Sequence, residues 1–214
     1  MQLIGMLDSP YVRRVAVSLQ LLGLPFQHRS LSVFRTFVEF SRINPVVKAP
    51  TLVCDDGTVL MDSTLILDYA ESLAAPRRSL MPVRIDERGH ALRLIGLALA
   101  ACEKSVQIIY ERTLRPAEKQ HAPWLERVAG QLLAACAALE AEVAHRPLAV
   151  ASETIDQAGV STAVAWRFIR ETSAAEIVRA DAHPALRAFS EAAEALPEFR
   201  AAPHGEGTYR GGIQ

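Results

Sequence analysis

Apolar residues in the first eighty positions alternate between short runs and helical spacing. The short runs predict four strands, over residues 2–7, 26–31, 51–54 and 59–61. Helical spacing predicts helices over 11–22 and 64–73, with a short helix or turn over 34–40. Asp55-Asp56-Gly57-Thr58 separates the last two strands, and Asp-Gly favours the tight turn of a hairpin. The order β-α-β-α-β-β-α therefore predicts an α/β fold with one parallel β-α-β unit and one antiparallel hairpin.

The rest of the chain has only helical patterns. Apolar residues step by three and four along 92–109 and again along 125–143, which is typical of amphipathic helices. A second apolar stripe makes the first of these helices apolar on two sides, so we expect it at the centre of a bundle or against another chain. Shorter helices are predicted over 157–172 and 184–195. We predict three parts, namely an α/β domain over 1–76, a linker over 77–83 and an all-helical bundle domain over 84–214.

Composition and charge exclude several classes of protein. Of the 214 residues, 50% are hydrophobic and 22% are charged, which excludes wholesale disorder. The net charge of −1 and the lack of a Lys/Arg cluster argue against nucleic acid or an anionic membrane as a partner. No apolar run reaches the roughly 20 residues of a membrane-spanning helix, and no secretory signal pattern opens the chain. We therefore expect a cytoplasmic protein.

Cysteine and histidine positions do not suggest a metal site. Cys54, Cys102 and Cys136 are odd in number and far apart, which argues against a disulfide framework and a cysteine-rich zinc site. The six histidines lack metal-ligand spacing. No metal is predicted.

Ser9-Pro10 lies between the first predicted strand and the first predicted helix. Serine is a favoured N-cap and proline is favoured at the first helical position, so a simple helix cap is one interpretation. The other interpretation is an anion site, because a hydroxyl beside unpaired N–H groups and the positive end of the helix dipole can stabilise a thiolate. The two interpretations are compatible.

Two further motifs have both a structural and a functional interpretation. Pro50 in Lys48-Ala49-Pro50 is either an ordinary trans edge proline or a cis turn that leaves the backbone of Ala49 free to pair with an extended peptide. Asp62 or Ser63 is either a helix cap or part of a zwitterion site, with Asp62 binding an ammonium and Ser63 a carboxylate.

Together these motifs resemble the cytosolic glutathione transferases. The resemblance runs through SPYVRRVAVSLQLLGLPF, NPVVKAPTLVCDDGTVLMDSTLILDYAE and HPALRAFSEAAEALPEFRAAP, and it covers nearly the whole chain. It implies a thioredoxin-like N-terminal domain followed by a helical domain, with glutathione as the co-substrate. The absence of a cysteine near Ser9 argues against the thiol-exchanging members of the family.

The resemblance also implies roles for the motif residues. Ser9 occupies the position of the catalytic hydroxyl in serine-type members, and Tyr11 is the alternative. Ala49 would pair with the cysteinyl part of glutathione beside a cis Pro50. The other implied glutathione contacts are Lys48 to the glycyl carboxylate, and Asp62 and Ser63 to the γ-glutamyl end.

The expected activity is the attack of glutathione thiolate on a small, apolar electrophile, as in detoxification. Helix faces predict an acceptor pocket between the domains, lined by Leu7, Tyr11, Val106, Tyr110 and Trp166. The resemblance also implies a homodimer. The alternatives are a non-catalytic binding or regulatory protein, and a glutathione-dependent isomerase, dehalogenase or disulfide reductase.

Overall fold

The chain folds into two compact units. In a computed structural model that describes residues 1–211, the first unit contains Met1–Met81 together with the segment from Ala195 onward. The second unit is Pro82–Glu194. The division differs from the predicted 84–214 helical domain, because the last segment of the chain returns to the first unit. Residues 212–214 of that prediction lie outside the described residues.

A four-stranded mixed sheet forms the centre of the first unit. The strands are β1 (Gln2–Ile4), β2 (Gln27–Arg29), β3 (Thr51–Val53) and β4 (Val59–Met61), in the spatial order β2-β1-β3-β4. β1 runs parallel to β2 and antiparallel to β3, which in turn pairs antiparallel with β4. The parallel β1–β2 pair and the β3–β4 hairpin confirm the prediction, whereas the pairing of β1 with β3 was not predicted. Three of the four strands are shorter than their apolar runs. Gly57, with φ of +87°, makes the turn of the hairpin.

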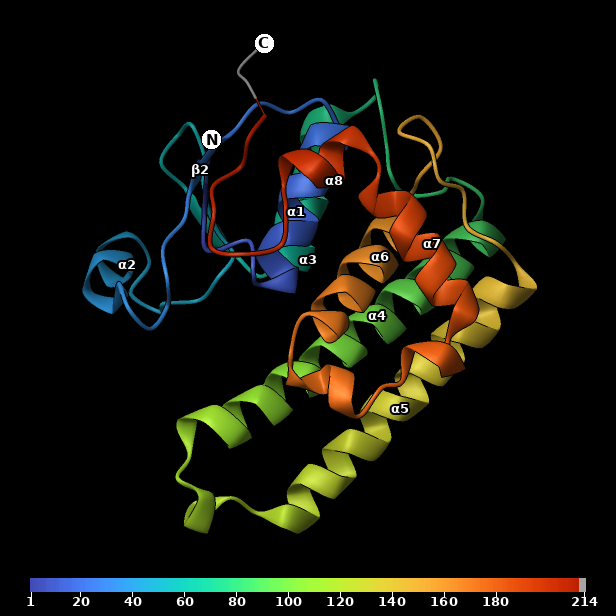
Figure 1. Cartoon of the computed structure of the whole chain (residues 1–214). Coiled ribbons are helices and arrows are strands. Elements are labelled where there is room, and N and C mark those ends of the chain that lie inside the picture. Colours follow the sequence, from blue (N-terminus) through green and yellow to red (C-terminus); the bar gives the residue numbers. More distant parts are fainter. Residues whose placement is uncertain (212–214) are drawn as a thin grey trace. The chain divides into compact units, whose positions relative to one another are not determined.

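The helices of this unit follow the predicted order. They are α1 (Pro10–Leu21), α2 (Phe37–Ile43) and α3 (Ser63–Ala74), and α1 packs against α3 (Figure 1). Leu3, Leu52 and Ile66 are fully buried. This arrangement confirms the thioredoxin-like α/β prediction.

The C-terminal segment joins the first unit through a buried arginine. α8 (Pro197–Ala201) packs against α1. The Arg13 side chain, only 1% exposed, donates from Nε to the carbonyl of Ala202 at 2.7 Å and from Nη2 to that of Phe199 at 3.4 Å. A buried guanidinium requires such acceptors. Since Phe199 and Ala202 are themselves fully buried, these two residues belong to the first unit's core.

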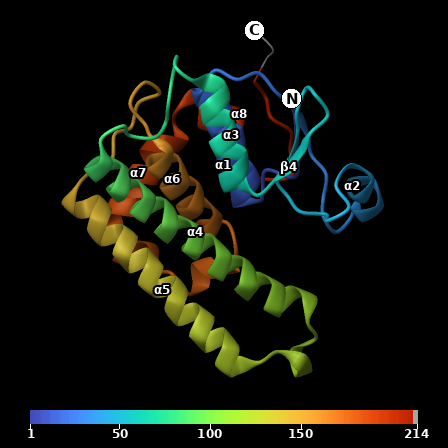
Figure 2. The ribbon, with the colours of Figure 1, turned by 180° about the vertical axis from the view of Figure 1, so that it is seen from behind.

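The second unit is a helical bundle. Its helices are α4 (Ile85–Leu114), α5 (Ala122–His145), α6 (Gln157–Arg170) and α7 (Pro184–Glu194), with short 3₁₀ turns η1 (Ala117–Lys119), η2 (Ser173–Glu176) and η3 (Ala180–Ala182). α4 packs against both α5 and α6, as Figure 2 shows, which confirms the prediction that the two-sided helix is central. Asp156 caps α6 by accepting the Gly159 amide at 2.8 Å. Within the described residues, no helix is both long enough and apolar enough to cross a membrane.

Candidate functional site

Three segments meet beside one row of paired residues in the sheet. Ile4 of β1 pairs with Thr51 of β3, and Thr51 pairs with Met61 of β4. The chain leaves this row toward Ser9, enters it from Pro50 and leaves it again at Asp62. Sheet register therefore brings the three predicted motifs to the same end of the first unit.

Gly5 allows the first two segments to approach closely. Its φ is +133°, which favours glycine, and a Cβ placed there would lie 2.6 Å from Val12 Cγ2 and 3.1 Å from Ala49 Cβ. The turn containing Ala49 thus lies directly beside the start of α1.

Ser9 is the N-cap of α1, and Pro10 is the first helical residue. The Ser9 Oγ accepts a hydrogen bond from the Val12 amide at a long 3.4 Å, and the Ser9 amide donates to the Met6 carbonyl at 3.2 Å. Within residues 1–211 the Ser9 hydroxyl hydrogen makes no internal hydrogen bond. The half-buried hydroxyl can therefore donate to an atom bound at the helix N-terminus while its oxygen stays part of the cap.

A hydrogen-bonded turn presents the backbone of Ala49. Asn44 Oδ1 accepts the Val46 amide at 3.0 Å, Asn44 Nδ2 donates to Thr51 Oγ1 at 2.9 Å, and Thr51 Oγ1 donates to the Lys48 carbonyl at 2.7 Å. The Ala49–Pro50 peptide bond is cis, which is the second of the two interpretations above. Within the described part of the chain, the Ala49 N–H and C=O take no internal hydrogen bond, so both are open to an extended ligand.

Asp62 and Ser63 lie at the start of α3, and their side chains already have hydrogen-bond or ion-pair partners within the protein. Asp62, at φ of +72°, accepts the Thr64 amide at 2.9 Å, and its Oδ2 lies 3.5 Å from Lys48 Nζ. Ser63 Oγ accepts a hydrogen bond from Arg14 Nη1 at 3.1 Å, and both residues are only 3% exposed. The site thus holds a carboxylate, a hydroxyl and a buried guanidinium around one helix N-terminus.

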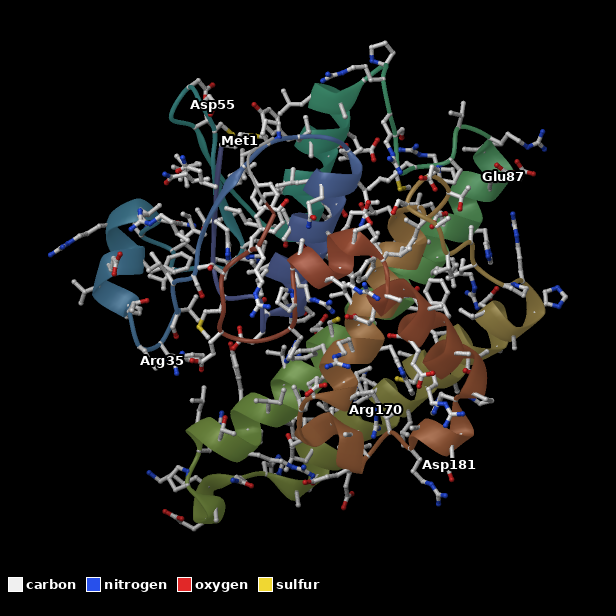
Figure 3. The ribbon with its side chains drawn as sticks, turned by 45° about the horizontal axis from the view of Figure 1, so that its top comes forward. Met1, Arg35, Asp55, Glu87, Arg170 and Asp181 are labelled. Carbon is white, nitrogen blue, oxygen red and sulfur yellow. The ribbon has the colours of Figure 1, made fainter. Side chains whose placement is uncertain are left out.

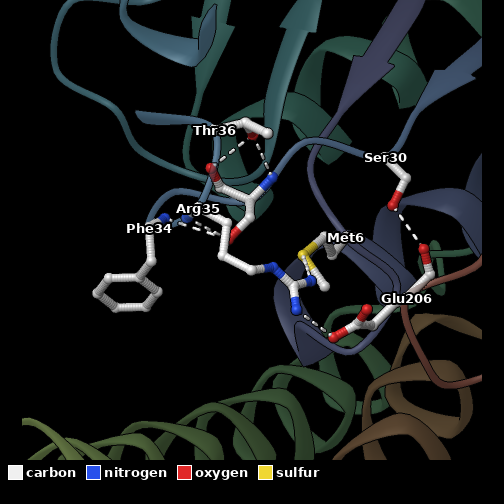
Figure 4. A network of polar contacts seen from close by, with 7 residues as sticks. Met6, Ser30, Phe34, Arg35, Thr36 and Glu206 are labelled. Carbon is white, nitrogen blue, oxygen red and sulfur yellow. Dashed lines mark hydrogen bonds and ion pairs between the residues drawn. The ribbon is translucent and has the colours of Figure 1, made fainter. Parts of the chain in front are cut away.

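A second charged group lies beside Met6 (Figure 4). Met6 belongs to residues 5–9, which we call the Ser9 loop. Arg35 pairs with Glu206 at 2.8 Å, and its Nη2 lies 3.7 Å from Met6 Sδ. Burial raises the pKa of the Asp8 carboxyl above its usual value, opposed by the Ser9 amide; Glu206 raises this pKa further and Arg35 lowers it. The Ser9 loop therefore lies in a field set by Asp8, Arg35 and Glu206.

The predicted acceptor residues are divided between the two units. Leu7 and Tyr11 belong to the first unit and the other three to the second. Leu7 is fully buried and Tyr11 is half-buried. Trp166 is buried against His183 at a ring distance of 5.4 Å, whereas Tyr110 is 43% exposed and Val106 is half-buried. The composition of an acceptor pocket stays a prediction.

A cavity of about 570 Å³ lies at the opposite end of β1 and β3 from the row. It is lined by Met1, Phe26, Cys54 and Asp55, among others. The Met1 ammonium and Asp55 Oδ1 are 2.5 Å apart at its edge (Figure 3). None of the motif residues lines this cavity, so it is separate from the candidate site.

Sequence reasoning missed several residues that build the site. Arg14, Asn44 and Arg35 were not among the candidates. A signal existed for Arg14, because Arg13-Arg14 interrupts the apolar spacing of Val12 and Val15. For Asn44 and Arg35 only the tertiary contacts identify the role. In the described part of the chain, no group of three His, Cys, Asp or Glu side chains could hold a metal ion.

Known proteins are similar to this chain in sequence and in architecture. The family model described as "Glutathione S-transferase, N-terminal domain" matches residues 3–78. A glutathione S-transferase from Methylobacterium radiotolerans, solved with glutathione sulfonate, is 26% identical with a TM-score of 0.85, covering 94% of this chain and 93% of that one. A glutathione transferase family member from Pseudomonas fluorescens Pf-5, solved with S-(propanoic acid)-glutathione, is 30% identical with a TM-score of 0.77, covering 94% and 98%.

The chain belongs to the glutathione transferase family. Its fold, its motif order and its similarity over nearly the full length of the Pseudomonas protein agree on this. Glutathione transferase GST 23 from maize is 27% identical over 112 residues, which are 52% of this chain. The matched part spans 50% of the length of that maize relative.

Proposed function

We propose that the protein is a glutathione transferase that joins glutathione thiolate to a small, apolar electrophile. The observation that carries the proposal is the convergence of the Ser9 hydroxyl, the open backbone of Ala49 and the Asp62–Ser63 pair on one end of the sheet. The Methylobacterium and Pseudomonas structures contain glutathione derivatives, which supports the same ligand here.

In this proposal each motif holds one part of glutathione. Ser9 Oγ donates to the sulfur, and Ala49 pairs with the cysteinyl backbone in the manner of an added strand. Asp62 binds the γ-glutamyl ammonium, while Ser63, supported by Arg14, binds the γ-glutamyl carboxylate. Lys48 approaches the glycyl carboxylate after giving up part of its contact with Asp62.

The role of Ser9 is to favour the thiolate over the thiol. The thiolate is the nucleophile, and a helix N-terminus with a hydroxyl donor lowers the pKa of a bound thiol. Each unit of pKa corresponds to about 1.4 kcal/mol of preferential stabilisation of the thiolate. The sulfur attacks the electrophilic carbon and a C–S bond forms. In a substitution, the leaving group departs with the electron pair of its bond to carbon. In an addition to a double bond, the displaced π electron pair takes up a proton.

Replacing Ser9 tests the proposal. We expect Ser9→Ala to raise the pKa of bound glutathione by about one unit or more, and to lower kcat/KM near neutral pH by roughly ten- to a hundredfold. Ser9→Thr should keep most of the activity because it retains the hydroxyl. The measurements are thiolate absorbance against pH and conjugation to a generic aromatic electrophile.

Other outcomes would redirect or overturn the assignment. Full turnover in Ser9→Ala together with loss in Tyr11→Phe would move the hydroxyl role to Tyr11. Glutathione binding without turnover on a broad panel of electrophiles would favour the regulatory alternative, and no binding by calorimetry would exclude the transferase.

We also propose a cytoplasmic homodimer. Three apolar side chains of the first unit, Phe34, Phe37 and Val38, are 54%, 55% and 64% exposed and fall within five consecutive positions, and exposed apolar surface favours a protein partner. The wider family assignment supports a second copy of this chain as that partner.

A further inference from the structure

The C-terminal strap, defined as residues 203–211, lies along the edge strand β2 of the first unit (Figure 1). The Glu206 carboxylate pairs with Arg35, and the Glu206 carbonyl accepts a hydrogen bond from Ser30 Oγ at 2.8 Å. The Tyr209 ring stacks on Phe26 with ring centres 4.6 Å apart. These contacts lie within the first unit.

His28 connects this strap to the loop that carries Ser9. Its Nε2 lies 2.7 Å from the Gly5 carbonyl, and its Nδ1 lies 3.0 Å from the Tyr209 amide. A carbonyl can only accept and an amide N–H can only donate, so Nε2 carries the hydrogen and Nδ1 carries the lone pair. Gly5 begins the segment that continues through Met6 to Ser9, so a single imidazole joins both segments.

We propose that His28 is a positioning residue and a pH-sensitive contact, which holds the strap while neutral and releases the strap on protonation. A protonated imidazole has an N–H on Nδ1 facing the Tyr209 N–H, and two donors cannot bond each other. The contact to Gly5 survives protonation, because Nε2 remains a donor. Protonation therefore acts selectively on the strap.

The direction of the pH effect follows from the burial of His28. Burial lowers the pKa of His28 below its usual value, although the Gly5 carbonyl opposes this shift. The docked strap therefore disfavours protonation of His28. Docking of the strap is unaffected above about pH 6.5 and weakens as the pH falls below that value. If the free imidazole has its ordinary pKa, docking at about pH 5.5 weakens by up to about tenfold.

Other titratable groups lie on the elements around His28 and on the strap itself, and His204 of the strap is a second imidazole. The residues of β1 that face His28 do not titrate, and Arg29 beside it on β2 pairs with Glu39. The strap carries His204 and Arg210. It also carries Tyr209, whose pKa burial raises above its usual value, and Glu206, whose pKa Arg35 lowers. Glu198 of α8 contributes to the shift of the pKa of Tyr209. Asp8 has a raised pKa and calls for a control.

The test is hydrogen exchange of the full-length protein at about pH 7.5 and about pH 5.5, corrected for intrinsic exchange rates. Wild type should lose protection of the Tyr209 amide by several-fold, up to about tenfold, at the lower pH. His28→Asn keeps an acceptor near the position of Nδ1 and should stay protected at both pH values. His28→Gln keeps only the Gly5 contact and should be unprotected at both.

Three controls separate His28 from the other titratable groups. His204→Gln should retain the pH step, because the Tyr209 amide bonds to His28. Asp8→Asn should retain the pH step, and Glu206→Gln should lower protection at both pH values while keeping the step. An unchanged pH step in His28→Asn, or no step in wild type, would overturn the proposal. Amides of α1 and α3 should keep their protection, which excludes unfolding of the first unit.

A second readout concerns the Ser9 loop and rests on the proposed function. Affinity for S-methylglutathione, measured by calorimetry, should fall at the lower pH in wild type but not in His28→Asn, because release of the strap withdraws Glu206 from Arg35, which lies beside Met6. Equal pH dependence in both proteins would refute the link to the loop. If neither protein binds at any pH, the transferase proposal fails, while the exchange result still decides whether His28 holds the strap.

Discussion

Arg14 and Ser63 form a buried polar pair whose two members depend on each other. Arg14 extends from α1 and donates to Ser63 at the start of α3, where both side chains are excluded from water. A buried hydroxyl and a buried guanidinium are costly when left without partners. The pair therefore stabilises the packing of α1 on α3, and in our proposal it also places positive charge behind the carboxylate-binding hydroxyl.

Replacing Arg14 tests both roles. We expect Arg14→Met to lower the free energy of unfolding by about 1–3 kcal/mol, because Ser63 loses its buried donor. Affinity for glutathione should fall roughly tenfold, equivalent to about 1.4 kcal/mol. Urea denaturation and calorimetry measure the two effects.

Arg29 provides the matched control. It pairs with Glu39 at 2.9 Å, but the two side chains are 42% and 50% exposed. Exposed pairs contribute less than about 1 kcal/mol, so Arg29→Met should change stability little. Equal losses in the two variants would contradict the assigned role of Arg14.

At the scale of elements, the strand β1 and the helix α1 can approach the turn at Ala49 only through a glycine. Gly5 has both a positive φ and no space for a Cβ. Gly96 in α4 is the opposite case, since it lies in a helix and nothing would lie within 4 Å of an added Cβ. The same substitution should therefore have opposite effects at the two positions.

We expect Gly5→Ala to cost about 2–4 kcal/mol, since the methyl group meets Val12 and the backbone angle suits glycine alone. Gly96→Ala should stabilise by about 0.5–1 kcal/mol, because alanine has the higher helix propensity. The measurement is the urea midpoint of each variant beside wild type. A Gly5→Ala protein with an unchanged midpoint would be inconsistent with the close approach to Val12.

At the scale of the whole molecule, residues 195–211 contribute two separate layers to the first unit. α8 supplies buried residues and the carbonyl acceptors of Arg13, whereas the strap supplies mostly exposed polar contacts and one aromatic stack. Their contributions to stability should differ accordingly.

Two truncations measure this difference. A chain ending at Glu194 lacks Phe199 and Ala202, and we expect a loss of about 3–5 kcal/mol in the stability of the first unit. A chain ending at Ala202 keeps both residues and lacks the strap, which should cost about 1–2 kcal/mol. Circular dichroism during urea denaturation measures both losses. Equal destabilisation by the two truncations would show that α8 is not part of the core.

Much of the fold and part of the site follow from local patterns. The order of the elements along the chain, the Asp56–Gly57 turn and the two-sided helix α4 were predicted from apolar spacing and turn chemistry. Ser9 and Asp62 were found as cap residues because capping depends on a few neighbouring positions. Helix ends and strand lengths shifted by a few residues, because tertiary pairing rather than apolar content sets where a strand ends.

The sequence by itself determined most of the elements, their order and the candidate cap and turn residues, because caps, turns and amphipathic faces are encoded within a few residues. Only the tertiary structure decided which side chains support them. Arg13 with Phe199, Arg14 with Ser63, and His28 with Tyr209 join residues that are 49 to 186 positions apart. Such contacts depend on the packing of whole elements, for which no local pattern exists.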